Sequence, residues 1–185
     1  MKSKFRSVVK SFWQRKRRQR VDNPTVSLKR EEEIILPYFN VVRIYGGKAE
    51  ITIEQRERSS VRLMGWGRKA WPVHYRCHNS ILDIRVLTAP GSRQFFKLAI
   101  SSPLINCLWL EGSSFIRSRN TLVSEVFEVH HHGDGEVELS VSSNKVETYC
   151  KGVGILSLQG KTNYWRDSSS LLARVNALGL LVTVG

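Results

Sequence analysis

One short phrase recurs through the second half of the chain, and this repeat limits the folds open to the sequence. The copies are LEGSSFI (residues 110–116), HGDGEVELSV (132–141), KGVGILSLQG (151–160) and, more loosely, ALGLLVTVG (177–185). Each copy has a turn of small residues before a short apolar and β-branched run, and Gly133 and Gly135 of the second copy recur as Gly152 and Gly154 in the third. This 19-residue period is about one rung of a β-solenoid, in which each unit buries its apolar side against its neighbours.

Alternation inside the repeats indicates which side chains face the core. In the second copy, Val137 and Leu139 alternate with polar residues, so on a strand they share one face. In the third copy, Leu156 and Leu158 take the corresponding positions. The last copy is out of phase when it is counted from Gly179, so either Gly179 is not the equivalent glycine or the last rung is an atypical cap.

The part of the chain before residue 101 shows the period of two that is typical of half-buried strands. Residues 39–55 predict two strands separated by Gly46 and Gly47, a pair that can take the positive φ of a tight turn. The same alternation returns three more times between residues 61 and 100. Because helical periodicity is confined to residues 1–20, the sequence predicts an all-β domain.

Positive charge is concentrated at the N-terminus. The chain carries 29 Lys and Arg against 16 Asp and Glu, a formal net charge of +13. Residues 1–20 hold nine Lys and Arg and no acid, which leaves 20 against 16, or +4, for the rest of the chain. A polyanionic partner is therefore expected at this arm before anywhere else.

The basic arm also has apolar residues at helical spacing, which would form one apolar stripe on a helix. A basic amphipathic helix suits an anionic membrane surface, and the same charges suit nucleic acid, which we favour less. The plain alternative is a disordered basic arm without a dedicated partner. The residues predicted to contact a membrane or polyanion are Lys2, Lys4, Phe5, Arg6, Lys10, Phe12, Trp13, Arg15, Lys16, Arg17, Arg18 and Arg20.

The order of the β-phrases resembles a bacterial family, the putative autotransporter adhesin head domain, or GIN domain. Its opening phrase F-x-x-I-x-V-x-G-x-x-x-V-x-I-x-Q is similar to this chain at Phe39, Val42, Ile44 and Gly46 and, after one extra residue, at Ile51, Ile53 and Gln55. Its glycine-serine turns look like the turns in the repeats of this chain. We expect those turns at Gly112, Gly133, Gly135, Gly152 and Gly154.

This resemblance implies a right-handed parallel β-helix-like solenoid of stacked short strands over residues 37–185, after a basic arm and linker over residues 1–36. It implies a non-enzymatic interaction module for adhesion or the cell envelope, without a cofactor, whose partner is a protein, glycan or lipid. The alternative is a membrane-surface or nucleic-acid binding protein that acts through the basic arm. The family setting is extracytoplasmic, while the sequence shows neither a signal peptide nor a transmembrane segment.

Few residues indicate chemistry. His130 and His132 would share a strand face and could bind a metal with Glu128 or Asp134. The pattern also fits a polar strand end, and nothing indicates a complete ligand set, so we predict no metal site and no catalytic residue. Three widely separated cysteines are more typical of buried small residues than of a disulfide framework.

A tryptophan-rich loop is the other candidate for binding. Trp66 and Trp71 flank Arg68 and Lys69. Such a loop would bind glycan, lipid or nucleic acid, or would pin itself onto the domain by its rings.

Overall fold

The computed structural model describes residues 33–65, 73–87 and 96–183, and all regular secondary structure in these ranges is β-strand. The predictions for the basic arm and for the loop of residues 66–71 lie outside the described residues. The strands are β1 (Glu33–Ile35), β2 (Val41–Gly46), β3 (Ala49–Gln55), β4 (Ser60–Gly65), β5 (Val73–His78), β6 (Ile81–Val86), β7 (Phe96–Ser102), β8 (Cys107–Gly112), β9 (Phe115–Ser118), β10 (Leu122–Gly133), β11 (Glu136–Lys151), β12 (Ile155–Asp167) and β13 (Arg174–Val182). The prediction of an all-β domain is confirmed.

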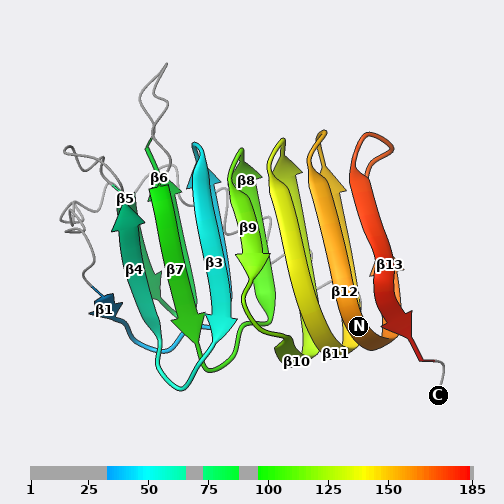
Figure 1. The fold of residues 1–185 in the computed structure, drawn as a ribbon, viewed down its shortest axis with the longest axis horizontal. Coiled ribbons are helices and arrows are strands. Elements are labelled where there is room, and N and C mark those ends of the chain that lie inside the picture. The colour runs from blue at the N-terminus through cyan, green and yellow to red at the C-terminus, as the bar shows by residue number, and fades with distance from the viewer. Residues whose placement is uncertain (1–32, 66–72, 88–95, 184–185) are drawn as a thin grey trace.

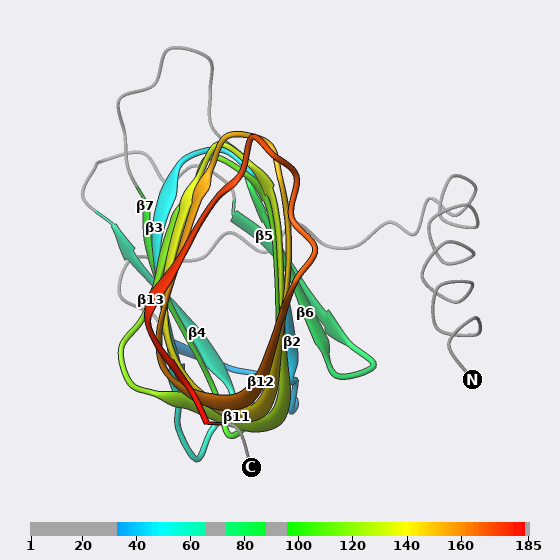
Figure 2. The same cartoon turned by 90° about the vertical axis from the view of Figure 1, so that its right-hand side faces the viewer.

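All thirteen strands belong to one sheet, which curls around a single core (Figure 1). The main path runs β1-β4-β7-β3-β9-β11-β10-β8-β2-β6-β5, and β12 and β13 follow beside β11. Strands β11 and β12 are 16 and 13 residues long, more than the short strands expected, and each bends from one half of the sheet into the other. Seen along the long axis, the two halves face each other across the core (Figure 2).

Strands in the C-terminal half pair in parallel at the period of the sequence repeat. Leu122 of β10 lies opposite Val141 of β11, and Glu136 of β11 lies opposite Ile155 of β12. Both pairs have the offset of the repeated glycines, so the 19-residue spacing of the glycines is the register of this part of the sheet. Between β8 and β10 the register differs slightly, because Cys107 lies opposite Glu128 in a 21-residue offset.

Polar side chains at the 19-residue offset also bond to one another across the strands. Such contacts add directional hydrogen bonds between equivalent positions, which favours this register over a shifted one. The pairs are Thr121 and Ser140 (3.0 Å), Ser124 and Ser143 (2.9 Å), and Thr148 and Asp167 (2.7 Å).

The aliphatic residues that alternate in the repeats form the core. Val137 lies opposite Leu156 and Leu139 opposite Leu158, and none of the four is more than 3% exposed. Burying each of these side chains stabilises the fold by about 1.5–3 kcal/mol before the entropy cost. The predicted equivalence of these pairs is confirmed.

The order of strands in the N-terminal half does not follow the order of the chain. Strands β2 and β3 lie between β8 and β9 on one side and β6 and β7 on the other, although β6 and β7 come later in the sequence. At this end β4 pairs with β7, and β5 with β6, in the antiparallel sense. These antiparallel strands end the parallel pairing.

Backbone approaches at the turns are too close for any side chain larger than that of glycine. A Cβ at Gly112 would lie 2.0 Å from the carbonyl oxygen of Gly46, and one at Gly152 would lie 2.5 Å from that of Gly133. Gly112 and Gly152 also have φ values of +132° and +108°, which side chains disfavour. The turns therefore stack with backbone directly on backbone.

The same hydrogen bond recurs at successive turns. The N–H of Gly135 donates to the carbonyl of Gly112 at 3.1 Å, and the N–H of Gly154 donates to the carbonyl of Gly133 at 3.0 Å. Each turn thus uses the turn before it as its hydrogen-bond acceptor, which satisfies buried backbone groups without side chains.

Three glycines that the sequence singled out do not have the roles predicted for them. Gly46 and Gly47 do not close a hairpin, because β2 pairs with β6 and β8 while β3 pairs with β7 and β9. Gly179 lies opposite Gln159, after a register shift in β13, and is therefore not the equivalent of the turn glycines. One full period after Gly154, the sequence has Ala173 in place of a glycine.

We predict that Gly112→Ala lowers the free energy of unfolding by about 2–4 kcal/mol, because the methyl group meets backbone and the φ is unfavourable. Urea unfolding measures this change. Gly179→Ala is the control, because Gly179 has no positive φ and its nearest neighbour is the Gln159 side chain; it should cost less than about 1 kcal/mol. Equal effects of the two substitutions would contradict the proposed stacking of the turns.

Candidate binding face

Four side chains from four neighbouring strands stand in one row on the outer side of the sheet. Arg43 of β2 lies opposite Trp109 of β8, Trp109 lies opposite His130 of β10, and His130 lies opposite Tyr149 of β11. All four are partly exposed. We call this row the outer ladder.

The rings of the outer ladder stack on one another. The ring centroids of Trp109 and His130 are 4.4 Å apart with 15° between the planes, and those of His130 and Tyr149 are 4.7 Å apart with 11°. Each such pair contributes about 0.5–1.5 kcal/mol beyond the burial of its area. Because the ring faces cover each other on both sides of His130, the stack turns ring edges toward solvent.

A second row follows two residues further along the same strands. His132 lies opposite Glu111 on one side and Lys151 on the other. Trp109 Nε1 donates a hydrogen bond to Glu111 Oε1 at 3.2 Å, and the Trp109 and His132 rings meet edge to face at 4.9 Å. Burial, and then the charge of Lys151, hold the pKa of His132 below its usual value. This row adds charged donors and acceptors beside the ring edges.

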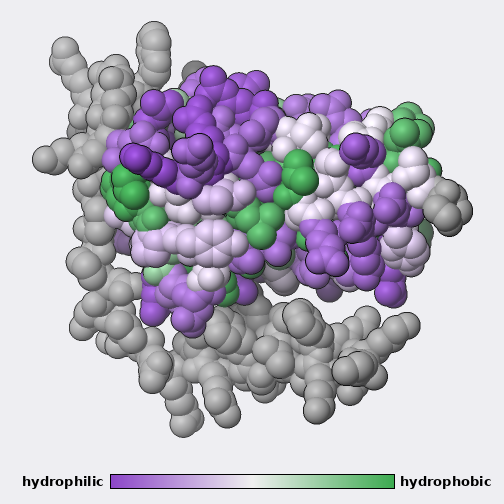
Figure 3. All heavy atoms as spheres, turned by 90° about the horizontal axis from the view of Figure 1, so that it is seen from below, coloured by the Kyte–Doolittle hydropathy of each residue, from purple (hydrophilic) through white to green (hydrophobic). Residues whose placement is uncertain are grey.

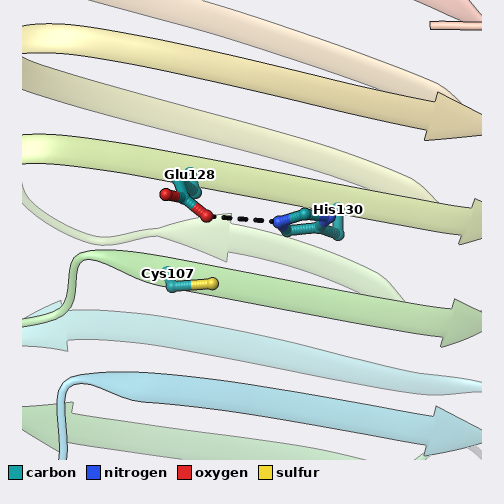
Figure 4. Close-up of side chains that lie close together, drawn as sticks. All are labelled: Cys107, Glu128 and His130. Carbon is teal, nitrogen blue, oxygen red and sulfur yellow. Dashed lines mark hydrogen bonds and ion pairs between the residues drawn. The ribbon is translucent and has the colours of Figure 1, made fainter. Parts of the chain in front are cut away.

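A third row lies two residues before the outer ladder and contains potential metal ligands. Cys107 lies opposite Glu128, and one ligand atom from each of Cys107, Glu128 and His130 lies within 4.8 Å of the others (Figure 4). Burial, and then the charge of Glu128, raise the pKa of the Cys107 thiol to about 12. The sequence pattern indicated Glu128 and His130 but not Cys107, because only the 21-residue offset between β8 and β10 brings that thiol to them.

The ladder continues as a polar cluster toward β6. Arg43 approaches Asp83 at 3.9 Å, and His78 approaches the other oxygen of Asp83 at 3.7 Å. Burial and the charge of Asp83 raise the pKa of Tyr45 to about 12. This end of the face is therefore held by the ion pair between Arg43 and Asp83, with His78 beside the same carboxylate.

His131 points the opposite way from its two histidine neighbours. It is 2% exposed and lies under the turn that contains Gly154, where an added Cβ would come within 2.3 Å of its Cε1. Its Nε2 has no hydrogen-bond partner among the described residues. Burial, followed by the charge of His132, lowers the pKa of His131 while Asp134 opposes the shift. His131 is thus a buried, uncharged core residue.

The other residues that the sequence proposed for chemistry lie apart from this face or outside the described chain. Asp134 accepts a hydrogen bond from the Ser113 hydroxyl at 2.6 Å and is not part of the metal-ligand cluster. All three cysteines are free. The basic-arm residues Lys2 to Arg20 lie outside the described ranges.

Apolar side chains are exposed at the C-terminal edge of the sheet. Leu178 and Leu181 of β13 are 98% and 64% exposed, and Figure 3 shows an apolar patch at the β13 end of a mostly polar face. Within the part of the chain that the structure describes, no helix is long and apolar enough to cross a bilayer.

Comparison with family models gives one match, to the "putative auto-transporter adhesin, head GIN domain", over residues 38–184. The chain belongs to this family. The resemblance inferred from the β-phrases is therefore confirmed. Comparison with curated protein sequences finds no match.

Several solved structures share the fold of this GIN domain. A putative adhesin from Bacteroides fragilis is 18% identical with a TM-score of 0.67, and the match covers 80% of this chain and 70% of that one. A putative adhesin from Parabacteroides merdae is 16% identical with a TM-score of 0.56, covering 80% and 72%. A putative lipid binding protein from Parabacteroides distasonis is 11% identical with a TM-score of 0.52, covering 80% and 73%. At these identities the likeness shows the fold alone.

For this GIN domain we predict that the free energy of unfolding decreases as the pH is lowered from about 7.5 to about 5. We expect His131→Leu to remove part of this decrease. The pKa of His131 is lowered in the folded state, so below about pH 6.5 the unfolded chain takes up a proton that the folded chain binds weakly. The contribution of His131 to the free energy of unfolding is complete above the pKa that this histidine has in the unfolded chain. Below that pKa it decreases by at most about 1.4 kcal/mol per pH unit.

Urea unfolding at the two pH values measures the difference. His74→Gln on the edge strand β5 is the control and should keep the wild-type fall. If His131→Leu keeps the full fall as well, His131 is not the group responsible.

Proposed function

We propose that this chain is a non-enzymatic interaction module of the cell envelope, with an adhesin-type role, and that it binds through the outer ladder. The observation that carries the proposal is the continuous stack of Trp109, His130 and Tyr149 across three strands, partly exposed on a rigid sheet. Membership of the adhesin head family supports the adhesin-type role, and the described neighbours include two putative adhesins. The cell envelope is the setting that this role requires.

The scaffold of the module, on this proposal, is a right-handed parallel β-helix-like solenoid. The 19-residue parallel register of β10, β11 and β12 supports it, and so do the turn hydrogen bonds that recur from one turn to the next. In such a stack the backbone groups of each strand form hydrogen bonds with those of the next strand. The side chains on the outer face can therefore vary without disturbing the stack. On this proposal the unit takes in residues 37–185 together with β1, which pairs with β4, and the residues before β1 form the arm.

The chemistry of the face favours a glycan. Ring edges, the Tyr149 hydroxyl and the charged side chains of Glu111 and Lys151 offer donors and acceptors in closely spaced rows. A hydroxyl-rich sugar chain can pair with many such groups, whereas an acyl chain would leave them desolvated and unpaired. A lipid, suggested by the Parabacteroides distasonis neighbour, is the next candidate, and a protein surface follows.

We predict that Trp109→Ala and Tyr149→Ala each weaken glycan binding by about tenfold or more, because each removes a ring at one end of the stack. Screening the full chain on a glycan array, followed by titration with the strongest ligand, measures the loss. Thermal unfolding of each variant checks that the sheet remains folded.

The matched control is Glu138→Ala, a substitution of an exposed residue on β11 in the other half of the sheet. Wild-type affinity in Glu138→Ala with loss in the two ladder variants supports the proposal. Equal binding by all the variants, or equal loss in all, would place the binding surface elsewhere.

A second function has its own observation. Residues 1–20 carry nine Lys and Arg and no acid, with apolar residues at helical spacing. We propose that this arm holds the module at an anionic membrane surface, where each positive charge contributes about 1 kcal/mol. Nucleic acid is the less favoured partner of the same charges.

We predict that replacing Arg15, Lys16, Arg17, Arg18 and Arg20 by Gln in the full chain abolishes sedimentation with phosphatidylserine vesicles. The reason is the loss of five charges from the segment that would face the lipid phosphates. Neutral phosphatidylcholine vesicles serve as the control surface, and retention on immobilised DNA tests the other partner. Sedimentation that is unchanged in the variant would eliminate the arm as a membrane contact.

A further inference from the structure

Cys107, Glu128 and His130 bring three kinds of metal-ligating atom together at one end of the outer ladder. Their ligand atoms all lie within 4.8 Å of one another (Figure 4). A thiol, a carboxylate and an imidazole in one place form a donor set that suits zinc and related divalent ions, because sulfur and nitrogen ligands disfavour magnesium and calcium.

The fold holds these three residues on adjacent strands. Cys107 of β8 lies directly opposite Glu128 of β10, and His130 follows Glu128 on the same face. The same pairing ends at Gly112 and Gly133, where backbone contact forbids a side chain and fixes the register. The donors therefore come from a rigid sheet rather than from loops, as a metal site requires.

The imidazole of His130 is held in place on both faces. Trp109 stacks on one side at 4.4 Å and Tyr149 on the other at 4.7 Å between ring centroids. In this position Nε2 lies 3.4 Å from Glu128 Oε2. That is long for a hydrogen bond, whereas two ligands at about 2.1 Å from a tetrahedral metal lie about 3.4 Å from each other.

Glu128 brings one carboxylate to the cluster. Glu147 of β11 lies opposite Glu128 but is paired with Lys145 at 2.9 Å, and Arg43 acts on Cys107 with the opposite sign. The Cys107 thiol holds its proton at neutral pH when no metal is bound, and coordination displaces such a proton. The side chains of His130 and Glu128 are 18% and 35% exposed, which leaves an approach from solvent.

We propose that Cys107, Glu128 and His130 bind one divalent transition-metal ion of the zinc class, with the fourth position open toward solvent. The bound ion would join β8 to β10 and would stand beside the outer ladder, where the open position can take a water molecule. This proposal does not depend on the glycan-binding function of the face.

Titration of the tag-free full chain with Co²⁺, after removal of metals with EDTA, tests the proposal. Cobalt bound through a thiolate gives a sulfur-to-metal charge-transfer band, and a four-coordinate site gives visible bands. We expect saturation at one ion per chain, displacement by Zn²⁺ and a rise in the thermal midpoint with Zn²⁺.

Matched variants separate this site from other ligands of the chain. Cys107→Ser should lose the charge-transfer band, and His130→Gln should weaken binding by at least roughly tenfold, the loss that even an outer-shell partner costs. Cys77→Ser and His132→Gln are the controls and should bind as the wild type does. Circular dichroism confirms that all four variants fold.

Two results would overturn the proposal. One is a wild-type chain that does not saturate at one Co²⁺. The other is a charge-transfer band that survives in Cys107→Ser or disappears in Cys77→Ser.

Discussion

Backbone contact between stacked glycine turns is the constraint on which the rest of this structure depends. At Gly112 and Gly152 a Cβ would collide with the carbonyl of the turn before it. The contact sets the distance and the register between neighbouring strands at once. Because a shift of one residue would turn every side chain to the other face, the same contact decides which side chains are buried and which are presented.

The fixed register explains why the outer side of the sheet carries ordered rows of side chains. Trp109, His130 and Tyr149 come from separate strands, yet they stack because their strands are in register. His131 lies between two members of these rows in sequence and points into the core, under a turn glycine that leaves room for its ring. The outer rows and the core are thus two sides of the same strands.

The sequence predicted the parts of the fold that depend on local pattern. The 19-residue glycine period, the alternation of Val137 with Leu139 and the family were all visible in the chain itself. The position of β2 between β8 and β6 was not, because it depends on which strands meet after long connections. For the same reason the sequence showed Glu128 and His130 but not the thiol of Cys107 beside them, since that contact needs a 21-residue offset that no repeated phrase marks.

Methyl–methyl nuclear Overhauser effects in the folded chain measure the parallel 19-residue register on which the stacked turns and the outer rows rest. With Val and Leu methyl groups labelled, we expect contacts between Val137 and Leu156 and between Leu139 and Leu158, since each pair lies directly opposite in the core. Strong contacts that instead join Val137 to Leu158, without the contact to Leu156, would show a register shifted by two residues. That result would contradict the stacking of the turns and, with it, the rows of side chains on the outer face.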